Sequence, residues 1–509
     1  MLDQAQVDIN VRGKSGRTPV MTAAAFGQKE VFDLLVRRGG DLLVVDDNEY
    51  NILHVACMGG DVEMVKYILL QDTVDVNRRG HYGRTAMMMA AEFGHGELLD
   101  FFMDKGDISL VDNDCNNILH VACLGGNVDV VQNILSRDIV DINSRGKYDR
   151  TPTMMAVGGG FRDVFDLLVA KGADVSLMDN DGNTVLHVPF IGGHAEMVKY
   201  VLSQVSVEIN GRGQYGRTPL MMSAVKGNWK AFEVLVNKGC DLSPVDNGGY
   251  NILHVACLGG SFEVVKYLVS RKIIDINSRG QYGRTPVMIA AETGHREVLD
   301  LLMKEGGDLT QLDDDGENIL HVACMRDHVE MVKYVISLHI VDINSRGSFG
   351  RTPLMTAASG GHRDAFEKLV ENGADMSLKD EDGEDILHIA CLGDNVDMVK
   401  HILLQTSVDV NSKGQYGRTP IMTAAAKGHG KAFDLLRWNG ADVSLADDHG
   451  NNILHLACVG NREKMLKYII SLNIIDINAR NKYGLTAAMI AIEKNNLTLY
   501  DHLAMQSGL

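Results

Sequence analysis

An internal repeat runs through this chain of 509 residues and constrains its fold more than any other feature. A segment reading GRTPVM returns seven times with small changes, at intervals of 67 residues or, once, 66. Its copies begin at Gly16, Gly83, Asp149, Gly216, Gly283, Gly350, Gly417 and Gly484. Self-similarity at a fixed period is typical of a repeat architecture, in which each unit packs only on its neighbours. We therefore expect residues 1–509 to form a single continuous array.

A second motif, NILHVAC, lies halfway between these copies and first occurs at residues 51–57. The repeating unit therefore has 33 or 34 residues and exists in two alternating types. We call them Met-type, after Met21 and its equivalents, and His-type, after His54 and its equivalents. Eight units of the first type and seven of the second give about fifteen repeats. The His-type histidines are His54, His120, His187, His254, His321, His388 and His455.

Each unit carries the start and stop signals of two helices. Met-type units have Thr, and most His-type units have Asn, at a position where either side chain can accept a bond from the free amides of a helix start. In six Met-type units Pro follows the Thr, at the first helical position, where its missing N–H costs nothing. A residue such as Gly27, nine positions after the cap, ends this first helix. A second helix follows, as in residues 62–70, with its apolar residues on one stripe.

This pattern resembles the ankyrin repeat, whose 33-residue unit carries a TPLHxA signature. The resemblance covers the chain from about residue 7 to its end. It implies an all-α solenoid of helix-turn-helix units with projecting hairpin loops, arranged as a curved superhelical array. In the family the signature His ties loop and helix together by hydrogen bonds, a role that we carry over to the His-type histidines. Met-type units hold Met at this position, so we expect them to rely on packing.

Three places depart from the regular pattern. Pro189 stands inside the first helix of its unit, where it removes one backbone hydrogen bond, so we expect a local irregularity there. Residues 1–10 align with the tail of a His-type unit and are interpreted as a partial repeat or a missing N-terminal cap. An uncapped end would expose an apolar stacking face. Residues 478–509, with a polar turn and last helix, are interpreted as a C-terminal capping repeat.

Composition and residue spacing exclude several classes of function. The net charge of −18 argues against nucleic acid and anionic membranes, because both reward basic surfaces. No apolar run approaches the ~18 residues that span a bilayer. Six of the eight cysteines share one register without forming a CxxC pair, so we interpret them as buried residues of a protein in a reducing compartment. The histidines lack a second ligand at metal spacing. We expect no catalysis, metal, cofactor, membrane insertion or small-molecule substrate.

The connectors between units alternate in charge. Met-type tips read RGxYGR and His-type tips read DxDG, so basic and acidic hairpins should alternate along one edge. One interpretation is a ladder of ion pairs between adjacent tips, which fixes the stacking register. The other is a partner-binding edge, because Tyr and Arg are frequent anchors of protein interfaces. The candidate edge consists of Tyr82, Arg84, Tyr215, Arg217, Tyr282, Arg284, Phe349, Arg351, Tyr416 and Arg418.

The resemblance also implies candidate modification sites. Asparagines in VDIN-like segments lie in the setting that asparaginyl hydroxylases favour in ankyrin repeats. The alternative is that each Asn bonds its own turn. The candidates are Asn77, Asn143, Asn277, Asn344 and Asn411.

Two hypotheses of function remain. The first is an intracellular scaffold, in the cytoplasm or alternatively the nucleus, that binds unidentified partner proteins along its concave face and hairpin tips. The second is a partner-recruiting module of a larger signalling, ubiquitin-ligase or channel protein. Every cluster of His, Cys or Asp is periodic, so the sequence offers no unique polar constellation for an enzyme.

Overall fold

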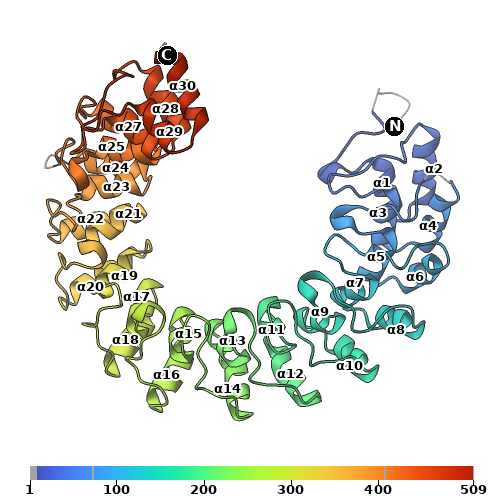
Figure 1. Ribbon diagram of the computed structural model, residues 1–509. Coiled ribbons are helices and arrows are strands. Elements are labelled where there is room, and N and C mark those ends of the chain that lie inside the picture. The colour runs from blue at the N-terminus through green and yellow to red at the C-terminus, as the bar shows by residue number, and fades with distance from the viewer. Residues whose placement is uncertain (1–7, 72–73, 406–407, 508–509) are drawn as a thin grey trace. The chain divides into compact units, whose positions relative to one another are not determined.

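The computed structural model describes residues 8–71, 74–405 and 408–507 (Figure 1). These residues contain thirty α-helices and no strand, which confirms the predicted all-α class. The chain divides into two compact units, Met1–Gly248 and Gly249–Leu509, which are built in the same way.

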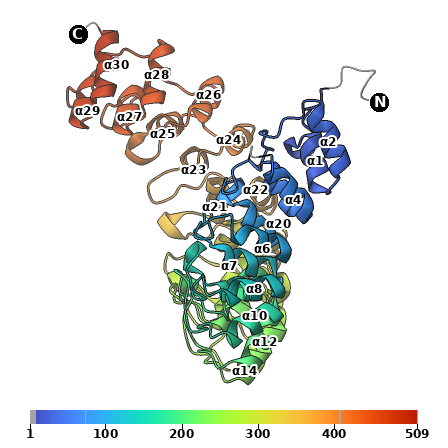
Figure 2. The same ribbon diagram turned by 90° about the vertical axis from the view of Figure 1, so that its right-hand side faces the viewer.

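The helices of the first unit form two rows (Figure 1). Odd-numbered helices form the first row, in which α1 to α11 pack on one another in order, and each is followed by an even-numbered helix of the second row. Figure 2 shows the second row as a column from α4 to α14. The first row consists of α1 Pro19–Ala25, α3 Ile52–Gly59, α5 Ala86–Glu92, α7 Ile118–Gly125, α9 Pro152–Gly158, α11 Val188–Gly192 and α13 Pro219–Val225. The second row consists of α2 Lys29–Arg37, α4 Val62–Leu69, α6 Gly96–Met103, α8 Val128–Ser136, α10 Arg162–Ala170, α12 Glu196–Gln204 and α14 Trp229–Asn237.

The second unit repeats this arrangement, which confirms the predicted helix-turn-helix unit. Its first row consists of α15 Ile252–Leu258, α17 Pro286–Glu292, α19 Ile319–Cys324, α21 Pro353–Gly360, α23 Ile386–Leu392, α25 Pro420–Lys427, α27 Ile453–Val459 and α29 Ala487–Glu493. Its second row consists of α16 Phe262–Ser270, α18 Arg296–Lys304, α20 Val329–Ser337, α22 Arg363–Glu371, α24 Val396–Leu403, α26 Gly430–Trp438, α28 Glu463–Ser471 and α30 Leu497–Ser507.

The first-row helices of Met-type repeats begin at the predicted Thr. In six of them the hydroxyl accepts the backbone N–H three residues later, over 3.3–3.4 Å. At Thr285 and Thr419 the hydroxyl has no hydrogen-bond partner within the described part of the chain. Pro286 and Pro420 follow these two residues, and their fixed backbone angle suits the first helical position without a cap. The capped starts are Thr18, Thr85, Thr151, Thr218, Thr352 and Thr486.

In His-type repeats the capping Asn and the signature His form a bridge to the next repeat. The side-chain oxygen of Asn51 accepts the backbone N–H of His54 over 3.0 Å. The buried imidazole then donates its Nε2–H to the carbonyl oxygen of Arg84 in the next repeat, over 3.0 Å. Burial lowers the pKa of His54 to about 4, so its ring is neutral, and Nδ1 lies 2.6 Å from the side-chain oxygen and 3.4 Å from the backbone nitrogen of Asn51. All seven histidines reach the next repeat over 3.0–3.1 Å, which confirms the role predicted for them.

Met-type repeats fill the corresponding position by packing, as predicted. Their Met side chains are at most 2% exposed, with the exception of Met489 in the last repeat. Burying a Met side chain stabilises a fold by about 1.5–3 kcal/mol, which compensates for the missing His bridge. The buried residues are Met21, Met88, Met154, Met221, Met288, Met355 and Met422.

Pro189 produces the predicted irregularity. The other His-type first-row helices begin directly after the cap, but α11 begins only at Val188, after a turn over residues 185–187. Pro189 has no N–H to offer the carbonyl of Val185, and its ring would clash with that carbonyl in a regular helix. The neighbouring α12 also lacks a side-chain cap, because Ala195 stands before it.

Apolar side chains are exposed near both ends of the described chain. Phe26 and Val31 lie at the surface of the first repeat, and Leu497 and Met505 lie at the surface of α30. The partial repeat predicted for residues 1–10 falls mostly on residues 1–7, which lie outside the described residues. That interpretation, the capping role of residues 478–509 and the single array over residues 1–509 stay predictions.

Replacing Pro189 by Ala should lengthen α11 at its N-terminus, because the substituted residue would have an N–H to donate to the carbonyl of Val185. We expect a gain of about 1 kcal/mol in the free energy of unfolding and slower amide hydrogen exchange at residues 185–190. Pro219→Ala is the matched control, because Pro219 occupies the first position of α13 and its change should stay within about 0.5 kcal/mol. Unchanged exchange in the Pro189→Ala variant would contradict this account.

Candidate functional site

Most Met-type tips are tight turns whose middle residue has a left-handed backbone conformation. In the six turns with an aromatic middle residue, φ lies between 54° and 60°. This conformation costs a non-glycine residue roughly 1–2 kcal/mol, so the surrounding contacts must impose it. The aromatic residues are Tyr82, Tyr148, Tyr215, Tyr282, Phe349 and Tyr416, and the corresponding residue of the first tip is Ser15. The turns are Lys14–Gly16, His81–Gly83, Lys147–Asp149, Gln214–Gly216, Gln281–Gly283, Ser348–Gly350 and Gln415–Gly417.

Contact with the next repeat imposes the geometry of each tip. The left-handed residue turns its carbonyl toward the following acidic tip, so that Tyr82 accepts the backbone N–H of Asn113 over 2.7 Å. Gly follows in most tips, as at Gly283, where φ is +69° and a Cβ atom would lie 2.2 Å from Oδ1 of Asp314. The six aromatic rings are left at the surface, 52–64% exposed. Each unit carries three of them at equivalent positions of successive Met-type repeats, and we call the three of each unit, and all six together, the aromatic row.

Sequence reasoning missed one member of this row. Tyr148 is 53% exposed and left-handed like the others, but its tip reads KYDR instead of QYGR. Asp149 replaces the usual Gly and itself takes a φ of 61°. The repeat register reveals the residue, because Tyr148 lies 66 positions after Tyr82 and 67 before Tyr215. Periodic position is therefore a better guide to the row than the local motif.

The arginine that closes each tip pairs with an Asp of the next tip. Arg217, for example, places Nε 3.1 Å from Oδ2 of Asp246, whose side chain is 3% exposed. This finding confirms the ladder of ion pairs between adjacent tips. The predicted edge residues Arg84, Arg217, Arg284, Arg351 and Arg418 all take part, so their guanidinium groups are engaged within the fold. The seven pairs are Arg17–Asp46, Arg84–Asp112, Arg150–Asp179, Arg217–Asp246, Arg284–Asp313, Arg351–Asp380 and Arg418–Asp447.

The same arginines support the aromatic row. The guanidinium of Arg217 lies over the ring of Tyr215, 5.4 Å from its centroid, and Arg418 lies over Tyr416 at the same distance. Arg351 lies 5.6 Å from the ring of Phe349. A cation held over a ring stabilises its position by ~0.5–1 kcal/mol at exposed sites. The structure thus brings three of the five predicted pairs of ring and Arg together, whereas Arg84 and Arg284 pair with Glu92 and Glu292. The binding of the predicted edge residues to a partner stays a prediction.

The candidate hydroxylation sites bridge consecutive repeats. The side-chain oxygen of each Asn accepts the backbone N–H of an Asp in the next repeat, over 2.7–2.9 Å. The backbone N–H of the same Asn donates to an Asp two residues before it, so its own turn is satisfied as well. These side chains have a structural role, and their modification stays a prediction. The pairs are Asn77–Asp107, Asn143–Asp174, Asn277–Asp308, Asn344–Asp375 and Asn411–Asp442.

Comparison with known families agrees with the two-row fold, the His bridge and the projecting tips. The sequence matches the family described as ankyrin repeats (3 copies) in seven segments that together cover most of the chain. The segments are residues 1–80, 73–146, 153–246, 242–313, 287–380, 369–447 and 424–508. The chain is an ankyrin-repeat protein. Ankyrin repeats are in general non-catalytic modules that bind other proteins. The count of fifteen repeats stays a prediction.

Curated relatives of this ankyrin-repeat protein have varied functions. The human transient receptor potential cation channel subfamily A member 1 is 25% identical, over 90% of this chain and 39% of the channel. The E3 ubiquitin-protein ligase KEG of Arabidopsis thaliana is 25% identical, over 73% of this chain and 23% of the ligase. The ankyrin repeat domain-containing protein SAT10 of Stachybotrys chartarum is 21% identical, over 91% of this chain and 24% of that protein. The chain therefore spans less than half the length of each.

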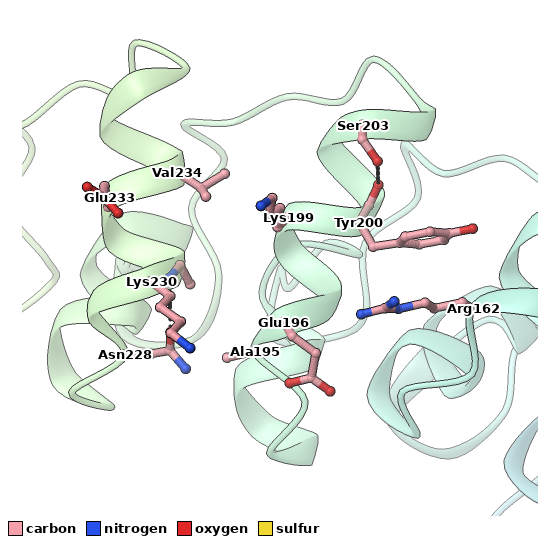
Figure 3. Close-up of a pocket in the computed structure, with 11 residues that line it drawn as sticks. Arg162, Ala195, Glu196, Lys199, Tyr200, Ser203, Asn228, Lys230, Glu233 and Val234 are labelled. Atoms are coloured by element: carbon pink, nitrogen blue, oxygen red, sulfur yellow. Dashed lines mark hydrogen bonds between the residues drawn. The ribbon is translucent and has the colours of Figure 1, made fainter.

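The second row of the first unit holds a cavity of about 610 Å³, beside the repeat of Pro189 (Figure 3). Its lining mixes cationic Arg162, Lys199 and Lys230 with anionic Glu196 and Glu233. Figure 3 shows these side chains extending from α10, α12 and α14. Because charges of both signs are interspersed, the cavity indicates no particular ligand.

One His bridge differs from the others in charge. In this repeat Asp385 replaces the capping Asn and accepts a hydrogen bond from Nδ1–H of His388 over 2.8 Å, while Nε2–H still donates to Arg418. Although burial opposes charge on the ring, the bond and charge of Asp385 raise the pKa of His388 above its usual range. Although burial also disfavours the carboxylate, the bond from His388 lowers the pKa of Asp385 to about 2. This bridge is therefore an ion pair.

Within residues 8–71, 74–405 and 408–507, no group of three His, Cys, Asp or Glu side chains is placed to bind a metal ion. Nor is any of the helices that they form long and apolar enough to cross a membrane.

Replacing Asp179 by Asn tests the ion-pair ladder. Asp179 pairs with Arg150 over 3.1 Å, and its Oδ1 accepts the backbone N–H groups of Asp181 and Asn183, which an amide oxygen can still accept. Its Oδ2 also accepts the side-chain N–H of Asn183, a bond that the variant loses with the ion pair. We expect a loss of about 1–3 kcal/mol in the free energy of unfolding, because the half-buried Arg150 loses its counter-charge. Urea denaturation followed by circular dichroism measures it. The exposed neighbour Asp181→Asn should change stability by less than about 0.5 kcal/mol, and equal losses in the two variants would argue against the ladder.

Replacing Asp385 by Asn should bring the pKa of His388 below 6.5, as in the other bridges. Because the folded-state pKa of His388 is raised, protonated His388 stabilises the fold. This contribution is fully present below pH ~6.5 and is lost as pH rises through the raised pKa. The stability advantage of the native chain over Asp385→Asn should therefore be larger at pH 5 than at pH 9. NMR titration of the His388 ring and urea denaturation at both pH values measure the two effects. An unchanged titration curve would refute the assignment.

Proposed function

We propose that this ankyrin-repeat protein is an intracellular scaffold that binds partner proteins along the aromatic row and the adjoining first-row helices. The supporting observation is that six large aromatic side chains are held exposed, in a strained conformation, at equivalent positions. A fold optimised for stability alone would place Asn or Gly there, because these residues adopt left-handed φ values at little cost. Strain that recurs at exposed aromatic residues is a reason to assign them a function.

The arrangement suits protein recognition. Tyr is enriched at binding hot spots, and a ring already held against Arg loses little conformational freedom on binding. The charges of the tip arginines are compensated by buried Asp side chains, so the arginines offer little to an acidic partner or to nucleic acid. The partners that we propose are therefore proteins, and the proposed role involves no catalysis and no cofactor.

The cytoplasm is the proposed compartment, with the nucleus as the alternative. All eight cysteines are free thiols, and six of them are buried in the same register of the first row. Burial raises the pKa of these six thiols, so they are unreactive and remain reduced. Eight unpaired cysteines suit a reducing environment.

Replacing the three aromatic residues of the second-unit row by Asn tests the proposal. The variant Tyr282→Asn, Phe349→Asn, Tyr416→Asn removes the rings and relieves the left-handed strain. We expect stability to be kept or raised and partner binding to weaken more than tenfold, since single hot-spot truncations cost ~2 kcal/mol or more. Affinity capture from cells, followed by crosslinking mass spectrometry, identifies partners and locates the contacts.

An exposed aromatic side chain outside the row provides the control. Trp438 is 70% exposed in the second-row helix α26, so Trp438→Ala should leave partner binding unchanged. Retained binding in the triple variant, or crosslinks confined to the second row, would count against the proposed edge.

A second candidate function is a recruiting module within a larger protein. It is favoured by the comparisons, because the channel and the ubiquitin ligase named above extend well beyond the matched segment. Sequencing the locus and its transcripts tests it, since an in-frame coding extension carrying an effector domain would support the module. Complete transcripts whose reading frame contains only ankyrin repeats would support the independent scaffold.

A further inference from the structure

A cavity of about 290 Å³ in the second unit lies beside one ring of the aromatic row. The tip residues Ser348 and Phe349 line one side of it. Met325, which follows α19, Thr356 of α21 and Glu317 line it as well, and so does Arg351, whose guanidinium pairs with Asp380. The volume is at the low end for a small-molecule site and suits a single side chain. Because Phe349 is 64% exposed, the cavity is accessible from the surface that we propose as the binding edge.

Glu317 distinguishes this cavity from the corresponding positions of other repeats. In repeats with Asn at this position, the Asn side chain forms a hydrogen bond with the next tip. Asn116, for example, accepts the backbone N–H of Lys147 over 3.0 Å. Where Tyr stands there, it contacts the signature His, as Tyr50 does. Glu317 is only 8% exposed, yet within the described residues its carboxylate accepts no hydrogen bond and forms no ion pair. Glu317 is therefore a largely buried carboxyl group that has no hydrogen-bond or ion-pair partner of its own among these residues.

The groups around Glu317 do not neutralise it. Burial raises its pKa to about 7, and the nearby carboxylates Asp313 and Asp315 act in the same direction. Arg284 and Arg351 oppose them, but both are engaged elsewhere. Arg284 pairs with Glu292 and Asp313, and Arg351 pairs with Asp380. Burial keeps His321, the signature His of this repeat, uncharged at neutral pH by lowering its pKa.

The equivalent residue in the next repeat lacks this property. Glu384 is buried to a similar extent, and burial raises its pKa, but it lies near the protonated His388, whose charge lowers it again. A cation of its own repeat therefore accompanies Glu384, whereas the arginines near Glu317 are paired with other carboxylates. A buried carboxylate is stabilised when a cation pairs with it and donates hydrogen bonds.

We propose that the cavity at Glu317 receives a cationic side chain, Arg or Lys, of the partner protein. The carboxylate of Glu317 pairs with the cation, the ring of Phe349 provides an aromatic surface beside it, and the hydroxyls of Ser348 and Thr356 are available as further acceptors. This inference rests on the proposed function, because it names the chemistry of a partner bound at the same edge.

A small cation tests the cavity without the partner. Ethylguanidinium chloride reproduces the end of an Arg side chain, and N-ethylurea is its uncharged counterpart. Carbon-13 labelling of the methionine methyl groups gives a probe in the cavity, because Met325 lines it. Met58 is the internal control, since it occupies the same register position beside Tyr50 instead of Glu. The variants Met325→Leu and Met58→Leu assign the two NMR signals.

We expect ethylguanidinium to shift the Met325 signal saturably, with a Kd on the order of millimolar, and to leave the Met58 signal in place. Glu317→Gln should weaken this binding more than tenfold, because the charge-assisted bond is lost. Binding should be about tenfold tighter at pH 8 than at pH 6, since the cation competes with the proton on Glu317.

Three results would overturn the proposal: no saturable shift at Met325, equal binding by N-ethylurea, or unchanged binding in Glu317→Gln. Unchanged methyl signals elsewhere in the chain show that the Glu317→Gln variant is folded. Glu317→Asn provides a second variant, because Asn is the natural residue in other repeats. Failure here is distinct from failure of the scaffold proposal, which depends on partner capture by the aromatic row.

Discussion

The register between repeats depends on one buried hydrogen bond, from the imidazole of each His-type repeat to a backbone carbonyl of the next. An unmade bond would leave a polar group inside the fold without water, so the next tip must end where its carbonyl meets the ring. The residue that supplies this carbonyl is in most cases the tip Arg, as at Arg84. Its guanidinium then pairs with Asp112 of the following tip. A single residue thus connects the repeat before it to the repeat after it.

The alternation of two repeat types has a consequence for the surface. Basic and acidic tips compensate each other inside the fold, because every tip Arg up to Arg418 has its Asp. The ring at the middle of six of these turns is exposed next to the compensated pairs. A sequence that predicts a charged edge therefore folds into one that also presents aromatic rings. Glu317 is a carboxylate that this compensation does not reach, and this is why it is informative.

Much of the fold could be predicted from the sequence, because period, caps and breakers are local signals. The Thr and Asn helix starts, the His bridge and the disturbance at Pro189 all follow from residue type and position. Less of the candidate site could be predicted from the sequence. The motif did not reveal Tyr148, because Asp149 replaces the usual Gly after it. The ion pairs of the tip arginines depend on distances between residues about 30 positions apart. The isolation of Glu317 depends on which neighbours already have partners, which spacing alone does not reveal.

The turn at Pro189 has a consequence for how the molecule loosens. In a repeat array stability is close to a sum of local terms, so opening begins wherever those terms are weakest. Ends are the usual weak points. Here an interior repeat has a shortened α11, which does not pack closely on α13, so the first unit has an interior place where the chain can open. Opening there would separate the repeats on either side while each stays folded, and would give the array an internal joint.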